Sequence, residues 1–149
     1  MRRLHSDSGA VAVEFALVMV PLLLILFGII DFGFAFNNQL AVTAAAREGA
    51  RIMAVESNKA DAATDAIKAV KAASTQLKPP VADDKVAFTY MNLATNPPTQ
   101  VASCASGGVN AMVAVTVTVT YEMHSTTGMF KPILDGKNLI GVGVMRCNG

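Results

Sequence analysis

Hydrophobic residues are concentrated in one long run near the N-terminus. Residues 15–30 contain no charged side chain, and the apolar run extends back to Ala10 with Glu14 as its one interruption. An α-helix rises about 1.5 Å per residue, so residues 10–30 would span roughly 30 Å, the thickness of a bilayer's hydrocarbon layer. Backbone polar groups in lipid must bond within their own segment. We therefore expect a transmembrane helix over residues 10–36, bent locally at Pro21.

The pattern beyond this run predicts that the same helix continues. Residues 41–55 contain no proline and are rich in alanine, the best helix former. We expect a juxtamembrane extension over residues 37–56, with the helix ending near Val55. The small residues Ala45, Ala46 and Gly49 in this extension would permit close approach of another helix.

The rest of the chain, residues 57–149, reads as an exported α+β domain. A break at Ser57 and Asn58 precedes a second helix over residues 59–77, which Asn58 would cap and Pro79-Pro80 would end. Alternating apolar residues then predict a small antiparallel three-stranded sheet, with the second helix, or both helices, packed on its apolar face. The three expected strands cover residues 85–91, 111–121 and 139–146, and a long loop separates the first two.

Composition narrows the function classes. The chain has 149 residues, 52% apolar and 15% charged, and a net charge of +1. Because its basic residues form no stripe with aromatic residues, nucleic-acid binding is not expected. No phosphate-binding loop, catalytic grouping or metal-ligand spacing is present, so we expect no enzyme activity, small-molecule substrate, cofactor or metal.

The two cysteines, Cys104 and Cys147, form no CxxC pair, and the only histidines are His5 and His124. In an exported domain two such cysteines are read most simply as one disulfide. It would tie the long loop to the last strand and contribute about 2–4 kcal/mol. Two buried free thiols are the alternative.

Charge at the N-terminus indicates the orientation of the helix. Arg2 and Arg3 precede the apolar run, so the positive-inside rule keeps the N-terminus cytoplasmic and translocates the chain after about residue 36. Arg47 and Arg51 follow the helix and weaken this asymmetry. A secretory signal peptide is the alternative interpretation, but the apolar run is longer than a typical signal core and no small-residue cleavage site follows promptly.

The start of the helix carries a second pattern. Gly9 is followed by four apolar residues, then Glu14 and Phe15, so the segment resembles the type IV prepilin class. That resemblance implies a leader of residues 1–9, removed by a membrane protease that cuts between Gly9 and Ala10. Glu14, one helical turn after the new ammonium group at Ala10, would offset its charge. An incidental glutamate at the membrane interface is the alternative.

Two blocks together resemble the TadE-like family of the tight-adherence pilus assembly system. The first is the apolar run from Gly9 with its Asp31-Phe32-Gly33 end, and the second is the juxtamembrane block Ala44-Ala45-Ala46-Arg47-Glu48-Gly49-Ala50-Arg51. The resemblance covers about residues 9–55. In this block Arg47 and Arg51 share one helix face and would either meet acidic partners or lipid phosphates, or remain solvated.

The resemblance implies a pilin-like minor pseudopilin in a bacterial inner membrane, with its C-terminal domain periplasmic or extracytoplasmic. Its implied partners are the lipid membrane, a prepilin peptidase, other pilin-like subunits and the inner-membrane pilus assembly machinery. It implies no catalytic activity. A membrane-tethered binding module with an uncleaved leader is the second hypothesis.

Overall fold

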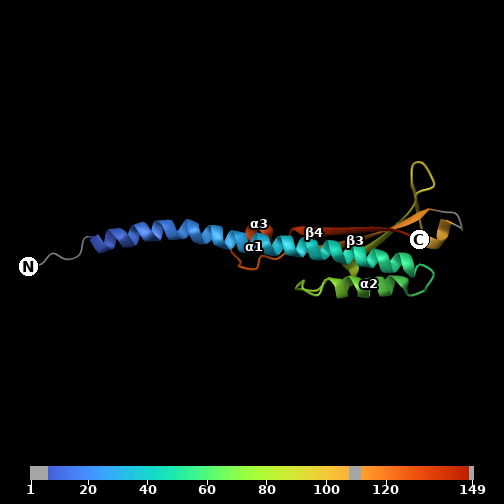
Figure 1. Cartoon of the computed structure of the whole chain (residues 1–149), viewed down its shortest axis with the longest axis horizontal. Helices are drawn as coiled ribbons and strands as arrows, with labels where there is room; N and C mark the ends of the chain where they lie inside the picture. The colour runs from blue at the N-terminus through green and yellow to red at the C-terminus, as the bar shows by residue number, and fades with distance from the viewer. Residues whose placement is uncertain (1–6, 108–111, 148–149) are drawn as a thin grey trace, which may run out of the picture.

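One helix dominates the chain. A computed structural model describes residues 7–107 and 112–147. Helix α1 (Asp7–Val55) runs for 49 residues and continues through Pro21. As Figure 1 shows, its N-terminal part projects alone from the rest of the molecule, while its C-terminal part lies against every other layer. The expected continuation of the apolar helix to Val55 is confirmed.

The remaining elements form an α+β unit around the C-terminal part of α1. Its sheet has the order β2-β1-β3-β4, and every neighbouring pair is antiparallel. The elements are α2 (Ala62–Ala73), the 3₁₀ turn η1 (Asp83–Lys85), β1 (Val86–Asn92), β2 (Thr99–Val101), the 3₁₀ turn η2 (Cys104–Gly107), β3 (Val113–Glu122), α3 (Lys131–Leu134) and β4 (Asn138–Arg146).

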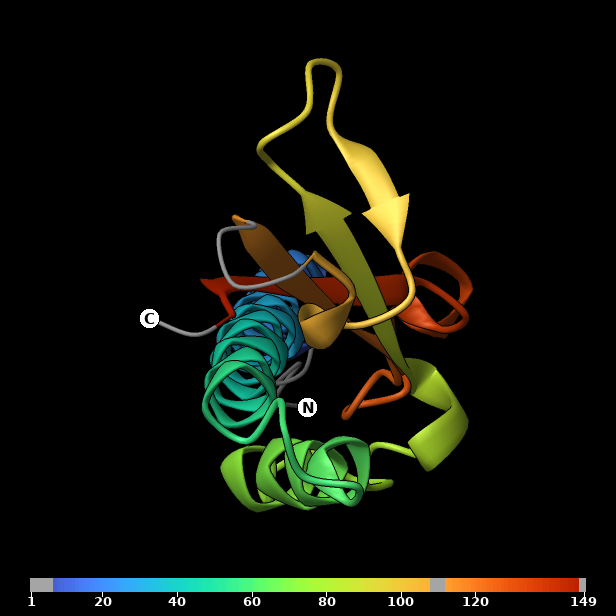
Figure 2. The same cartoon turned by 90° about the vertical axis from the view of Figure 1, so that its right-hand side faces the viewer.

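The core lies between α1, the sheet and α2. Strand β3 pairs with both β1 and β4, and its inward valines, among them Val115, Val117 and Val119, are all fully buried. Val42 of α1 and Val70 of α2 are also fully buried. Viewed along α1, Figure 2 shows this helix between strands β3 and β4 on one side and α2 on the other. The sheet is therefore covered mainly by the first helix, and the second helix packs on the first.

Two glycines of β4 bring that strand into backbone contact with α1. A Cβ atom at Gly141 would overlap the carbonyl group of Val42, and one at Gly143 would overlap the carbonyl group of Ala46. Only glycine fits such a contact between a strand and a helix backbone. This contact fixes where β4 crosses the helix.

The sheet has four strands rather than the expected three. The additional strand, β2, pairs with β1 through three residue pairs, from Tyr90 with Val101 to Asn92 with Thr99. It lies within the stretch expected to be a long loop. A three-residue strand is too short to show an alternating pattern, which explains why the sequence did not reveal it.

Helix α2 is shorter than predicted. It begins at Ala62, after Asp61, and its N-terminus has no side-chain cap, so the prediction that Asn58 caps it is wrong. At the other end the Ser74 hydroxyl donates to the carbonyl of Val70 at 2.7 Å, a bond that satisfies one of the last helix carbonyls. Residues 1–6 of the predicted leader lie outside the described residues, and so does residue 111, the first of the strand predicted over 111–121.

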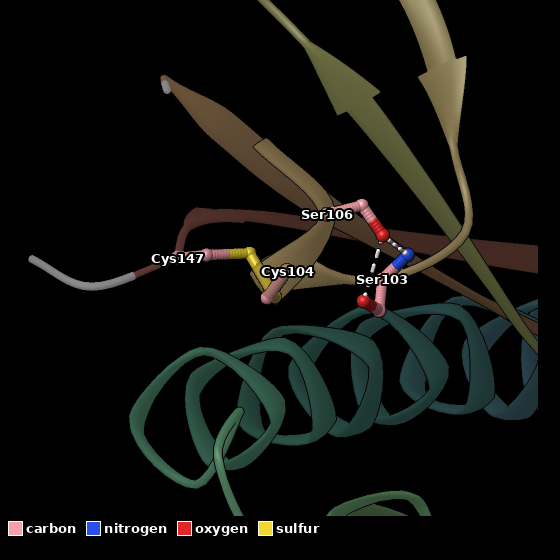
Figure 3. Close-up of a disulfide and its surroundings, with 4 residues drawn as sticks. All are labelled: Ser103, Cys104, Ser106 and Cys147. Atoms are coloured by element: carbon pink, nitrogen blue, oxygen red, sulfur yellow. Dashed lines mark hydrogen bonds between the residues drawn. A yellow bond between two sulfur atoms is a disulfide. The ribbon is translucent and has the colours of Figure 1, made fainter. Parts of the chain in front are cut away.

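The expected disulfide joins Cys104 of η2 to Cys147, directly after β4 (Figure 3). The two Cα atoms are 5.5 Å apart across a sequence separation of 43 residues. Beside it, the Ser106 hydroxyl accepts a hydrogen bond from the backbone N–H of Ser103 at 3.0 Å. The Cys147 N–H donates to the carbonyl of Val113 at 2.9 Å. The disulfide thereby links the segment that follows β2 to the end of β4.

Candidate functional site

The predicted processing segment lies at the exposed beginning of α1. Gly9, Ala10, Glu14 and Phe15 are all exposed, and Phe15 retains 66% of its accessible surface. Gly9 lies in the first turn, since the helix begins at Asp7, and a Cβ atom there would meet nothing within 4 Å. An enzyme could reach this turn without moving another part of the described chain.

The apolar run that follows forms an uncovered hydrophobic surface. Helix α1 is long and apolar enough to span a membrane, and none of its most apolar window is buried by the protein. Exposed large side chains cover all sides of this stretch, among them Leu17, Val20, Leu22 and Ile25, each with more than half of its surface accessible. In water such a surface is unfavourable, so it requires an apolar partner or solvent.

Asp31 is the first charged side chain after the apolar run, and it is held by residues far away in the sequence. Its carboxylate accepts hydrogen bonds from the Ser125 hydroxyl at 3.0 Å and from the Thr127 hydroxyl at 2.7 Å. The Thr127 backbone N–H adds a third bond at 3.0 Å. Asp31 is only 2% exposed, so this carboxylate is buried but well satisfied.

An aromatic contact reinforces the same junction. The Phe130 ring lies over Gly28, where an added Cβ would be 3.5 Å from it, and its centroid is 6.3 Å from that of Phe32. Residues 125–134, which include α3, therefore reach back along α1 by hydrogen bonds and by packing. We call this segment the clasp. No sequence pattern predicted the clasp, and the one sign of it is the acidic residue Asp31 at the end of the apolar run.

The predicted small-residue site is buried by the chain itself. Ala45 and Ala46 are fully buried. A Cβ at Gly49 would lie 2.6 Å from a methyl group of Val70 on α2 and 3.4 Å from one of Val117 on β3. These small residues thus allow α1 to lie close to α2 and the sheet.

The charged residues of the same block lie on the outer side of α1. Arg51 binds Glu48 through two bonds, of 2.6 Å from Nη2 and 3.0 Å from Nε. The hydrogen bond from Arg51 lowers the pKa of the Glu48 carboxyl, against a smaller opposing effect of desolvation. Arg47 is exposed to solvent. Both arginines face away from the core, where a partner could reach them.

These features coincide with a known family. Residues 9–51 match the family model described as TadE-like protein. This stretch of the chain is TadE-like. The match confirms the resemblance found in the sequence, and it covers the processing segment, the apolar run and the small-residue block, all within α1. No curated protein and no solved structure matches the chain.

The TadE-like segment ends before α2, so the family match does not extend to the sheet or to the clasp. Within residues 7–107 and 112–147, no group of three or more histidine, cysteine, aspartate or glutamate side chains is placed to hold a metal ion. The family match and the predicted processing and juxtamembrane residues all lie along α1.

Proposed function

We propose that this protein is a pilin-like pseudopilin that takes part in the assembly of a tight-adherence type IV pilus. It is anchored in the bacterial inner membrane by α1, with its α+β domain on the extracytoplasmic side. The observation that carries this proposal is the division of one unbroken TadE-like helix into an uncovered apolar half and a half that forms the core of the domain. A family of this kind favours an assembly role without catalysis or cofactor.

The contacts of α1 favour a retained anchor over a removed signal peptide. Residues 125–134 contact Gly28, Asp31 and Phe32. Removing the helix up to residue 36 would leave Phe130 without this packing, and the hydroxyls that bind Asp31 without their acceptor. A domain built to hold this part of α1 is best explained by a helix that stays in the mature protein.

Within this proposal, a prepilin peptidase removes residues 1–9. Cleavage after Gly9 creates an ammonium group at Ala10, and the Glu14 side chain lies about 6 Å further along the helix axis. Glu14 can therefore pair with this ammonium group in its own chain or in a neighbouring subunit. In the part of the chain that the structure describes, Glu14 makes no ion pair, which leaves its carboxylate available for either arrangement.

N-terminal sequencing of the protein from membranes that contain the peptidase tests this function. We expect a mature terminus at Ala10 in the wild type and in Gly9→Ala, because both residues are small. Gly9→Leu should retain the leader, because the bulky side chain hinders entry into the protease. Normal processing of Gly9→Leu, or an intact leader in the wild type, would contradict the peptidase step and favour the uncleaved binding module.

Partner capture then separates assembly from simple tethering. A photo-crosslinking residue at Val13, which is 67% exposed on the apolar half of α1, should join this chain to other pilin-like subunits or to the assembly machinery in the native membrane. The same residue at Glu122, on the exposed end of β3, is the matched control. Crosslinks to lipid alone from Val13 would argue against an assembly role.

A further inference from the structure

The clasp contacts α1 at a position that would lie within the lipid tails if the membrane boundary were set by the apolar run alone. Its residues 125–130 are irregular backbone between β3 and α3, and they lie beside Gly28, Asp31 and Phe32. Irregular backbone exposed to lipid tails leaves its polar groups without hydrogen-bond partners, which is strongly unfavourable. If the membrane reached residue 36, the clasp would lie inside it.

The length of the helix gives a consistent solution. From Ala10 to Gly28 an α-helix rises about 27 Å, close to the thickness of the hydrocarbon layer. The hydrocarbon can therefore end beside Gly28, just before the carboxylate of Asp31. The clasp then begins where the lipid tails end.

The outer surface of the clasp has the chemistry of a membrane interface. Met129 is 48% exposed and Ile133 is 58% exposed, both within or beside the short helix α3. Lys131 and Lys137 are exposed nearby, and neither has an ion-pair partner among the described residues. Apolar side chains flanked by lysines bind the boundary between lipid tails and acidic headgroups.

We propose that the clasp is a second membrane contact, in which α3 lies in the headgroup layer and acidic phospholipid is bound by Lys131 of α3 together with Lys137, which lies just before β4. This inference rests on the proposed anchor, because α1 delivers the clasp to the bilayer surface. It places the outer membrane boundary at Gly28–Asp31 instead of at residue 36. It also fixes the height of the domain above the lipid.

Tryptophan placement tests the depth, because the chain contains no tryptophan of its own. Full-length Ile133→Trp is reconstituted into vesicles of phosphatidylcholine and phosphatidylglycerol and quenched by lipids that carry nitroxides at different depths. Ile133 follows Phe130 by three residues, and the Phe130 ring lies against Gly28 and near Phe32 of α1. That level of α1 is roughly ten residues after the middle of the apolar run, so we expect the tryptophan about 15 Å from the bilayer centre. Val20→Trp marks that centre and Val55→Trp marks water.

The outcomes separate the two proposals. Strongest quenching of Ile133→Trp by nitroxides near the headgroup, with Val20→Trp quenched by deep nitroxides, supports the clasp contact. If Val20→Trp is deep but Ile133→Trp is quenched only by aqueous acrylamide, the clasp inference is wrong and the anchor stands. If Ile133→Trp is as deep as Val20→Trp, the proposed boundary is wrong. If Val20→Trp is outside lipid, the anchor itself fails.

A pair of glycine variants tests whether the clasp's grip on α1 sets this depth. In the Ile133→Trp background, Gly28→Leu puts a bulky side chain where the Phe130 ring lies, and should shift the tryptophan towards acrylamide. Gly33→Leu is the matched control, because a Cβ at Gly33 meets nothing within 4 Å. Equal depth in both variants would overturn the role of the Phe130 contact.

A charge variant tests the lipid preference. Lys131→Gln combined with Lys137→Gln should abolish the difference in Ile133→Trp emission between vesicles with and without phosphatidylglycerol. A difference that survives in this double variant would overturn the role of the two lysines.

Discussion

The backbone contact between β4 and α1 makes Gly143→Ala a decisive substitution. Gly143 pairs with Val117 in the sheet and lies on the helix at Ala46 and Arg47. A Cβ atom at this position would lie 2.7 Å from the Arg47 Cα, whereas ordinary contacts begin at 3.4 Å. The obstructing atoms belong to the backbone, so no change of rotamer can relieve the overlap.

The expected cost follows from this geometry. To admit the methyl group, α1 must move away from β4 by roughly 1 Å, and a gap of that size forfeits a quarter to a half of the dispersion attraction across the contact. Overpacking of this kind costs about 1–3 kcal/mol, and a backbone obstruction belongs at the upper end. The lower backbone entropy of alanine returns about 0.5–1 kcal/mol. We expect a net loss of about 2–2.5 kcal/mol.

Hydrogen–deuterium exchange of the full chain in detergent measures this loss. A tenfold change in an equilibrium corresponds to about 1.4 kcal/mol, so the slowest amides of β3 and β4 should exchange roughly 30- to 60-fold faster in Gly143→Ala. Gly49→Ala is a control with a smaller expected loss. Its new methyl group would meet a movable side chain of α2 and no backbone, and alanine has a helix propensity about 1 kcal/mol more favourable than that of glycine. Gly33→Ala, in open space, should leave these amides unchanged.

Protection in Gly143→Ala equal to that of the wild type would refute the reasoning. It would mean that β4 and α1 are not in backbone contact at this position. Equal losses in Gly143→Ala and Gly33→Ala would also refute it, because the effect would then not depend on the obstruction.

Three further predictions concern other contacts. Asp31→Ala removes the acceptor of three hydrogen bonds, so exchange in the clasp should accelerate while the protection of β3 stays unchanged; loss of protection in both would contradict a local role. Replacing Cys104 and Cys147 by serine opens a closed loop and should lower the free energy of unfolding in urea by about 2–4 kcal/mol; an unchanged urea midpoint would contradict this. Burial raises the pKa of the Tyr121 phenol, whose hydroxyl donates to the Lys78 carbonyl. The stability that this phenol contributes is therefore complete below its unfolded pKa near 10 and is lost as pH rises through its folded pKa. Stability should therefore fall above about pH 10, more steeply in the wild type than in Tyr121→Phe, and equal slopes would refute the assignment.

The sequence revealed those parts of the fold that depend on local signals. The uncharged apolar run and the alanine-rich stretch after it are both helical patterns, and α1 ends at Val55 as expected. The alternation of valine and threonine after Met112 likewise predicted β3. In each case the pattern extends over ten residues or more, and the residues on either side favour the same secondary structure.

The parts that were missed depend on contacts between distant segments. The hydrogen bonds from Ser125 and Thr127 to Asp31 join residues more than ninety positions apart. No local pattern around either segment indicates that the two are in contact. The small residues around Gly49 signal a close approach, but not which element approaches. The residues of α1 that bear on function could thus be predicted from the sequence, but the distant segments that pack against them could not.

The seating of β4 on α1 has a mechanical consequence. A subunit withdrawn from a membrane by its helix carries the load along the helix axis, in shear against the sheet. Gly141 and Gly143 lie against the helix backbone at Val42 and Ala46, one helical turn apart, so strand and helix are in close contact over a full turn. A force along the helix is then distributed over all the contacts between α1 and β4, so these contacts do not break one at a time. In the proposed assembly role, this contact would keep the domain attached to a helix under load.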